Sequence, residues 1–188
     1  VVSDNSSQSA SCSVTVTVQD NTVPTAVCQN TTLQLDASGN ASLSTSAINN
    51  GSADACGIAS LALSKTMFNC SNIGTNSVTL SVTDNNNKTA TCAATVTVQD
   101  NIAPTAVCKD ATVQLDATGN VTVPASAVDN GSVDACGIAS LTLSHTTFNC
   151  TNVYQAVTLT VTDNHGKTAT CAAVITVQDN IAPAAICK

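Results

Sequence analysis

The sequence predicts an all-β protein built from tandem β-sandwich modules of about 80 residues each. Three observations support this prediction: a repeated sequence, alternating apolar and polar residues, and cysteines at recurring positions. The segment DACGIASL occurs at residues 54–61 and again at 134–141, which is 80 positions later. A period of this length is too long for a helical or leucine-rich solenoid. It suits a self-contained sandwich module of the immunoglobulin-like kind.

A second repeated stretch divides the chain into modules. VTVQDNIAPTAVC at 96–108 has the counterparts VTVQDNTVPTAVC at 16–28 and ITVQDNIAPAAIC at 175–187. Each copy is interpreted as the last strand of one module, a short linker and the first strand of the next, within a longer array or a head-to-tail assembly. The predicted organisation is the C-terminal strands of a preceding repeat at 1–20, complete repeats at 21–100 and 101–179, and the first strand of a following repeat at 180–188.

Within a repeat, alternation between apolar and polar residues predicts one strand after another. The segment 77–83 alternates, with Val78, Leu80 and Val82 on one face. In the next strand the residues on one face are Cys92, Ala94, Val96 and Val98. Further expected elements are strands near 41–47 and at 58–64, and turns at 36–40 and 84–87.

Composition indicates how such modules are held together. The 188 residues include ten cysteines but only two Phe, one Tyr and no Trp. A small module with few aromatic residues needs covalent support, and recurring cysteines in small β modules predict disulfides and an oxidising, extracellular setting. A zinc site is a weaker interpretation, because no C-x-x-C pair is present and neither histidine recurs between repeats.

Charge and motifs exclude several function classes. All twelve acidic residues are aspartate, and the formal net charge is −7. An acidic surface disfavours a nucleic-acid partner, and no apolar run is long enough to predict a membrane span. No enzymatic activity is expected, because no hydrolase, metalloprotease or phosphate-binding motif occurs. His145 and His165 occur only in the second repeat and are predicted to be surface residues.

The run VTLSVTDNNNKTATC at 78–92 recurs as VTLTVTDNHGKTATC at 157–171, and each is followed by a closing V/I-T-V-Q-D-N-x-x-P segment. This pattern resembles the hyalin-repeat (HYR) domain, and the resemblance covers essentially the whole chain. It implies tandem immunoglobulin-like domains of an extracellular or cell-surface protein, with an adhesive or structural role. Each repeat here has four cysteines, more than the eukaryotic pattern usually shows, so the family's disulfide pairing cannot be copied onto this chain.

Four cysteines per repeat permit three pairings. In an immunoglobulin-like module the first and last strands start at the same end and run side by side, so their cysteines can meet. The preferred pairs are therefore Cys28–Cys92, Cys108–Cys171, Cys56–Cys70 and Cys136–Cys150. A rival scheme joins Cys92 to Cys108, but a strand of eight residues carries the chain about 26 Å and a disulfide needs Cα atoms within about 7 Å. Cys12 and Cys187 are expected to pair outside this sequence.

The linkers are also candidate calcium sites. Asp20-Asn21 and Asp100-Asn101 are each followed by a proline three residues later, an arrangement that resembles the calcium linker of cadherins. Two loops at the end where the linker enters a module carry further aspartates, and Ca²⁺ takes six to eight oxygen ligands. The candidate ligands are Asp20, Asn21, Asp54, Asp84, Asp100, Asn101, Asp134 and Asp163.

The alternative for these side chains is a turn-only role, because Asp and Asn also form local hydrogen bonds in turns. Asp129 is a weaker candidate for a ligand, since the first repeat has Asn49 at the equivalent position. Calcium is the one cofactor that the sequence suggests.

The expected function is structural: a segment of an extracellular rod, stalk or filament, made rigid by disulfides and by short linkers that contain proline. The alternative is a ligand-binding module of a cell-surface adhesin that recognises carbohydrate or protein. The scarcity of aromatic residues disfavours carbohydrate binding. The expected partners are neighbouring repeats or subunits of the same protein, together with a cell-surface or matrix ligand.

Overall fold

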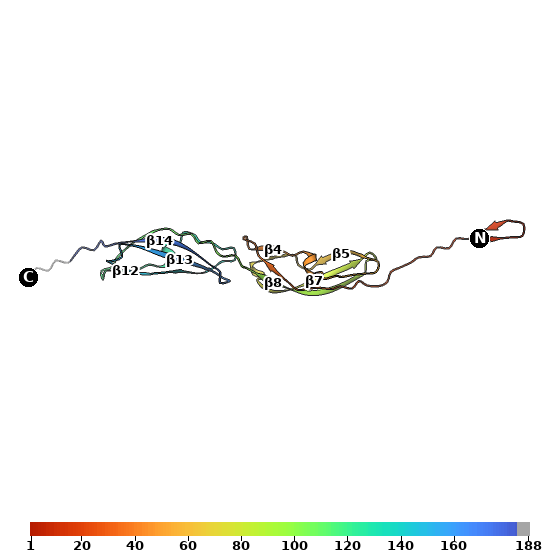
Figure 1. Ribbon diagram of the computed structural model, residues 1–188, viewed down its shortest axis with the longest axis horizontal. Helices are drawn as coiled ribbons and strands as arrows, with labels where there is room; N and C mark the ends of the chain where they lie inside the picture. Colours follow the sequence, from red (N-terminus) through yellow and green to blue (C-terminus); the bar gives the residue numbers. More distant parts are fainter. Residues whose placement is uncertain (184–188) are drawn as a thin grey trace, which may run out of the picture. The chain divides into compact units, whose positions relative to one another are not determined.

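The computed structural model describes residues 1–183, in which nearly all regular elements are β-strands (Figure 1). By its contacts the chain divides into two compact units. The first contains residues 1–29, 45–64 and 78–94, and the second contains residues 30–44, 65–77 and the chain from 95 onward. The second unit therefore includes part of the repeat at 21–100 as well as the repeat at 101–179.

The repeat at 101–179 lies wholly in the second unit and forms two sheets. Its four-stranded sheet has the order β11-β13-β14-β9, and a two-stranded sheet pairs β10 with β12. β9 runs parallel to β14, while the other pairs are antiparallel. The strand bounds are β9 Ala111–Gln114, β10 Asn120–Thr122, β11 Ile138–Leu143, β12 Thr147–Asn149, β13 Tyr154–Asp163 and β14 Thr168–Gln178.

The repeat at 21–100 has the same connectivity. One sheet has the order β3-β8-β7-β5, and a second pairs β4 with β6. β3 is parallel to β8, so the first and last strands run side by side as expected. Sheets connected in this way form an immunoglobulin-like sandwich, and the all-β prediction is confirmed. The bounds are β3 Thr31–Gln34, β4 Asn40–Ser42, β5 Ile58–Leu63, β6 Met67–Asn69, β7 Gly74–Asp84 and β8 Thr89–Gln99.

One predicted strand is wrong in its second half. The strand expected near 41–47 ends at Ser42, and the single-turn helix α1 (Thr45–Ile48) follows it. In the second repeat the equivalent segment is the 3₁₀ turn η2 (Ala125–Ala127), and a further 3₁₀ turn, η1 (Cys70–Asn72), follows β6. One helical turn is too short to show a helical period in the sequence.

The buried residues follow the predicted alternation. Val78, Leu80 and Val82 are each 0% exposed, and Ala94, Val96 and Val98 are also buried. In the second repeat one core cluster is formed by residues of both sheets and of the segments between them. Its buried members are Leu115, Val123, Val128, Phe148, Val157, Leu159, Val161, Ala173, Ile175 and Val177.

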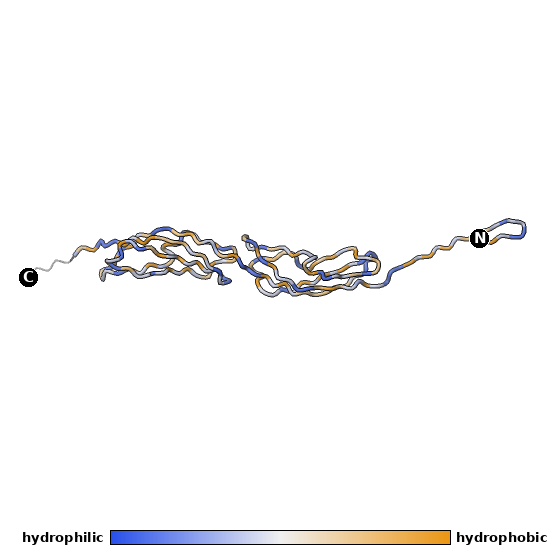
Figure 2. Tube along the Cα trace, in the orientation of Figure 1, coloured by the Kyte–Doolittle hydropathy of each residue, from blue (hydrophilic) through white to orange (hydrophobic). Residues whose placement is uncertain are grey.

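The N-terminal residues form a small hairpin of β1 (Val2–Ser3) and β2 (Ser9–Ala10), with a hydrophilic turn that is blue in Figure 2. Residues 184–188 lie outside the described residues, and with them Cys187 and most of the strand predicted at 180–188. No helix among residues 1–183 is long and apolar enough to cross a membrane.

Candidate metal centre and disulfides at the repeat joints

Two disulfides join the first and last strands of the two repeats. Cys28 is bonded to Cys92 and Cys108 to Cys171, each with Cα atoms 5.8 Å apart. These are the pairs expected from the strand topology, in which a short parallel pairing holds the first strand against the last. The rival pair Cys92–Cys108 is wrong.

The remaining cysteines do not pair within their repeats, so the expected bonds Cys56–Cys70 and Cys136–Cys150 are wrong. Instead Cys70 is bonded to Cys136, with Cα atoms 5.3 Å apart, and Cys56 and Cys150 are unpaired. Both bonded residues belong to the second unit. The bond therefore connects the repeat at 21–100 to the repeat at 101–179.

The second repeat shows why its own pair cannot form. Cys136 lies before β11, close to Asp100 at the end where the linker enters, which we call the entry end. Cys150 follows β12, and its Sγ lies 3.8 Å from the carbonyl oxygen of Gly119. The six residues of β11 extend about 20 Å between these places, whereas a disulfide needs Cα atoms within about 7 Å.

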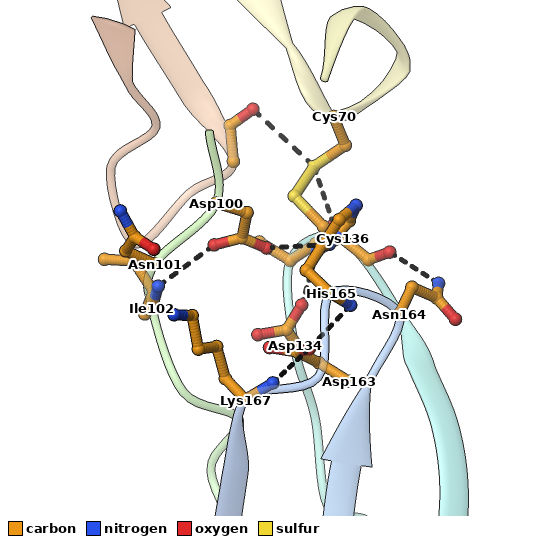
Figure 3. A network of polar contacts seen from close by, with 12 residues as sticks. Cys70, Asp100, Asn101, Ile102, Asp134, Cys136, Asp163, Asn164, His165 and Lys167 are labelled. Carbon is orange, nitrogen blue, oxygen red and sulfur yellow. Dashed lines mark hydrogen bonds and ion pairs between the residues drawn. A yellow bond between two sulfur atoms is a disulfide. The ribbon is translucent and has the colours of Figure 1, made fainter. Parts of the chain in front are cut away.

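Three aspartates converge beside the Cys70–Cys136 disulfide (Figure 3). Asp100 follows β8, Asp134 precedes β11, and Asp163 ends β13. One carboxylate oxygen each of Asp100 and Asp134 and the Cys136 sulfur all lie within 4.8 Å of one another. Figure 3 shows the carboxylates of Asp134 and Asp163 on the same side of the disulfide. We call these three aspartates the second joint.

One oxygen of each aspartate is used by its own turn. Asp100 Oδ1 accepts a hydrogen bond from the Ile102 amide at 3.1 Å, and Asp134 Oδ1 accepts one from the Cys136 amide at 2.7 Å. Asp163 Oδ1 accepts from the amides two and four residues later, at 2.7 and 2.8 Å. These aspartates therefore do hydrogen-bond within their turns, and each uses only one of its two carboxylate oxygens to do so.

At Asp100 and Asp163 the other carboxylate oxygen is unsatisfied. Asp100 is 6% and Asp163 1% exposed, and the buried Oδ2 of each accepts no hydrogen bond. Buried carboxylate oxygens without a partner are unfavourable. His165 Nδ1 lies 3.4 Å from Asp100 Oδ2 and compensates that oxygen when the ring is protonated. Because the available donors are carboxylate oxygens and Cys136 is in a disulfide, the second joint fits calcium rather than a thiolate-binding metal.

The first unit contains an equivalent group, Asp20, Asp54 and Asp84, which we call the first joint. The Cys56 amide donates to Asp54 Oδ1 at 2.7 Å, and Asp84 Oδ1 accepts from two amides of its own turn. The Oδ2 atoms of Asp20 and Asp84 are again buried without a hydrogen bond. The same unsatisfied oxygens thus occur at both joints.

The charges at the first joint affect each other's titration. Hydrogen bonds from the Thr22 hydroxyl and then the Thr22 amide lower the pKa of Asp20. The neighbouring Asp20 carboxylate raises the pKa of the Cys56 thiol most, with smaller contributions from burial, Asp54 and Asp84. One carboxylate oxygen each of Asp20 and Asp54 and the Cys56 sulfur lie within 4.8 Å of one another.

Other candidates have different partners. Asn101 Nδ2 donates to Gln34 Oε1 at 2.6 Å, so this amide is held at the ends of strands β3 and β8. Asn21 is exposed. Asp129 Oδ1 accepts from the Ser132 amide and hydroxyl at 3.1 and 2.5 Å. That bond belongs to the loop, as does the equivalent one in the first repeat.

The histidines have packing and ion-pair contacts. The ring centroid of His145 lies 5.0 Å from that of Phe148 in an edge-on contact. At the equivalent place in the first repeat, Lys65 Nζ lies 4.7 Å above the ring of Phe68. The shared feature is a polar side chain that covers a buried phenylalanine.

Comparison with known proteins gives only weak similarities. No protein-family model and no curated protein matches the chain. Human protocadherin-24 EC1-2 is 13% identical, with 85% of this chain and 100% of that chain covered and a TM-score of 0.44. Human mucin-like protocadherin EC1-2 is 16% identical (62% and 76% covered, TM-score 0.35). Drosophila N-cadherin EC1-4 is 12% identical (84% and 50% covered, TM-score 0.42). Similarities of this degree identify no family for the chain.

Proposed function

We propose that the chain is a structural segment of an extracellular rod, stalk or filament made of disulfide-bonded, hyalin-like repeats. The observation that supports this most directly is the Cys70–Cys136 bond, which connects one repeat to the next. A domain that only recognises a ligand needs no covalent bond to its neighbour beyond the backbone. A segment that carries tension gains from one.

The bonds within the repeats have a complementary role. Cys28–Cys92 and Cys108–Cys171 close loops with sequence separations of 64 and 63 residues. Each stabilises its repeat by about 4 kcal/mol in the chain-entropy model. Disulfides of this density persist in oxidising compartments, which supports an extracellular location.

Calcium is the second element of the proposal. Asp20, Asp54 and Asp84 would hold one ion at the first joint, and Asp100, Asp134 and Asp163 another at the second. The unsatisfied Oδ2 atoms at each joint support this assignment. A bound cation would neutralise converging carboxylates and connect the linker to two loops of the repeat that follows it. The linker prolines Pro24 and Pro104 are buried and restrict the same segments.

The adhesin alternative has less support. Both phenylalanines are buried, and the single tyrosine, Tyr154, is 75% exposed without an aromatic neighbour among the described residues. A stacking platform for a sugar ring is therefore missing from the described part of the chain.

Pulling the chain by its ends under oxidising and reducing conditions tests the structural proposal. In the oxidised chain the Cys28–Cys92 and Cys108–Cys171 bonds withhold two loops from extension. Reduction should add roughly 200 Å of contour length for each loop. A variant with Cys28→Ser and Cys92→Ser is the matched control, and its reduction should release one loop fewer. Free thiols at Cys70 and Cys136 in the oxidised chain, or saturable binding to a glycan array, would contradict the proposal.

A further inference from the structure

Two unpaired cysteines occupy positions that are bonded elsewhere in the same chain. Cys56 lies 80 positions before Cys136, and Cys150 lies 80 positions after Cys70. Cys70 and Cys136 are joined, whereas Cys56 and Cys150 are free and exposed. The chain thus contains one complete inter-repeat disulfide and, at two other places, one half of the same bond.

The half at Cys150 has the local geometry of its bonded counterpart. Cys150 Sγ lies 3.8 Å from the Gly119 carbonyl oxygen, and Cys70 Sγ lies 3.7 Å from that of Gly39. In both repeats an asparagine just before the cysteine accepts a hydrogen bond from the amide just after it, at 2.9 and 3.0 Å. The thiol is therefore held in the bonding position without a partner.

A surface hollow of about 590 Å³ lies at the same end of the second repeat, lined by residues 116–119, Asp179 and residues 181–183. We call this the exit end. Around Gly39, the counterpart of Gly119, the equivalent space is occupied. A Cβ on Gly39 would lie 3.2 Å from the Ala135 Cβ and 3.6 Å from the Cys136 sulfur. Among residues 1–183, a Cβ on Gly119 would meet only the Cys150 sulfur, at 3.2 Å. Gly39 thus has Ala135 and Cys136 beside it, whereas its counterpart Gly119 lines the hollow.

The half at Cys56 is also preformed. The Cys56 amide donates to Asp54 at 2.7 Å, and its carbonyl accepts from Asn85 Nδ2 at 2.7 Å. Cys136 makes the same two bonds, to Asp134 and Asn164, at 2.7 and 2.8 Å. The Ala-Cys-Gly corner therefore has one backbone arrangement whether or not its sulfur is bonded.

We propose that Cys150 and Cys56 are the two halves of inter-repeat disulfides, and that the hollow beside Gly119 seats the Ala-Cys-Gly corner of another repeat of this kind. That repeat belongs to a second copy of this chain, because every copy carries both free halves, one at Cys150 and one at Cys56. The proposal deepens the proposed function and rests on it, because it names what each open joint binds. The two thiols lose two protons and two electrons to a disulfide oxidant such as oxidised glutathione, which is released as two thiols.

Two complementary variants test this. Both have Cys12→Ser and Cys187→Ser; the first adds Cys56→Ser and keeps Cys150, and the second adds Cys150→Ser and keeps Cys56. In a glutathione redox buffer each variant alone should remain at the monomer mass. An equimolar mixture should give a disulfide-linked species of twice the 18.8 kDa chain mass. Peptide mapping should find Cys150 joined to Cys56.

A substitution next to Cys56 distinguishes specific binding in the hollow from random disulfide formation between exposed thiols. Ala55→Phe in the variant that keeps Cys56 should abolish the mixed dimer, because the corner no longer fits the hollow. Ala59→Phe, at an exposed alanine on β5, should leave its yield unchanged. Homodimers as abundant as the mixed dimer, or a mixed dimer that survives Ala55→Phe, would overturn the proposal.

The same samples distinguish a failure of this inference from a failure of the proposed function. If Cys70–Cys136 forms but Cys150–Cys56 does not, this inference fails and the proposed function stands; if neither forms, both fail. A chain extended after residue 179 by a further copy of residues 101–179 tests the source of the partner. A disulfide-linked dimer supports a second copy, and a bond to the appended repeat at monomer mass overturns it.

Discussion

Ala135 lies against Gly39 at the second joint, so closely that a Cβ on Gly39 would be 3.2 Å from the Ala135 Cβ. The same added atom would be 2.6 Å from the Cys70 sulfur. Gly39 has φ +72°, in the left-handed region that favours glycine. This glycine therefore both closes the turn after β3 and leaves room for the disulfide that connects the repeats.

We expect Gly39→Ala to impair formation of the Cys70–Cys136 bond, because the new methyl group overlaps the Cys70 sulfur. Alkylation and mass spectrometry of the oxidised chain should find thiols at both cysteines. Gly51→Ala is the control: Gly51 has φ +86° and nothing within 4 Å of an added Cβ. Both variants carry a similar backbone cost of about 1 kcal/mol. A fully formed bond in Gly39→Ala would show that the close approach is unimportant.

Calcium titration should detect two ions per chain, one at each joint. Combining Asp100→Asn with Asp163→Asn should reduce the calorimetric stoichiometry from two to one, because it removes the charge of both unsatisfied carboxylates at the second joint. Asp36→Asn serves as the control, since this exposed aspartate caps its turn through Ser38 at 2.8 Å and has no buried oxygen that lacks a hydrogen bond. Calcium at a hundred times its Kd should stabilise the binding repeat by about 2.7 kcal/mol. A calcium titration of the unmodified chain in which no heat of binding is measured would rule the ions out.

The pKa of Asp129 is lowered, chiefly by the hydrogen bond from the Ser132 hydroxyl. Because its folded pKa lies below the ordinary value of 3.8, this carboxylate contributes stability above that value, and the contribution is lost as pH falls through the folded pKa. Ser132→Ala should raise the Asp129 pKa in an NMR titration and leave that of Asp116 where it is. Asp116 is the internal control because its own lowered pKa depends on Thr118.

Asp129→Asn should make the unfolding free energy of the second repeat less sensitive to acid. The first repeat has Asn49 in this place, and Asn49 Oδ1 accepts the Ser52 amide at 3.0 Å, so the loop tolerates the amide. Denaturant unfolding between neutral pH and pH 3 measures the difference. An unchanged acid slope would mean that Asp129 has the same pKa in the folded and unfolded chains.

Phe148 is 2% exposed in the core of the second repeat, where its ring packs between the two sheets. Phe148→Ala should lower the unfolding free energy by about 3–5 kcal/mol, since it leaves a cavity that the surrounding residues fill only in part. Tyr154→Ala, at a 75% exposed position, should change it by less than about 0.5 kcal/mol. Urea denaturation followed by circular dichroism compares the two.

Features set by local periodicity could be predicted from the sequence. The alternation in residues 77–83 fixes which side chains face the core, because successive residues of a strand point to opposite faces. The pairing of Cys28 with Cys92 follows once the first and last strands are placed side by side. Helix α1 could not be predicted, since one turn shows no period.

The bond between Cys70 and Cys136 depends on information that spacing within a repeat does not contain. One must know at which end of the sandwich each cysteine lies, and this depends on the length of β11 and on the pairing of β10 with β12. The candidate metal centre depends more on local sequence. Its aspartates cap turns of recognisable sequence, although the unsatisfied second oxygens become visible only when the turns are brought together.

The three disulfides among residues 1–183 span overlapping stretches of the chain, 28–92, 70–136 and 108–171. Every peptide bond between Cys28 and Cys171 therefore lies inside at least one of these loops, and the linker at 93–107 is enclosed by the Cys70–Cys136 loop alone. A protease that cuts once anywhere in this region leaves both fragments covalently attached. Without the Cys70–Cys136 bond, a single cut in the linker at 93–107 would separate the chain into two fragments.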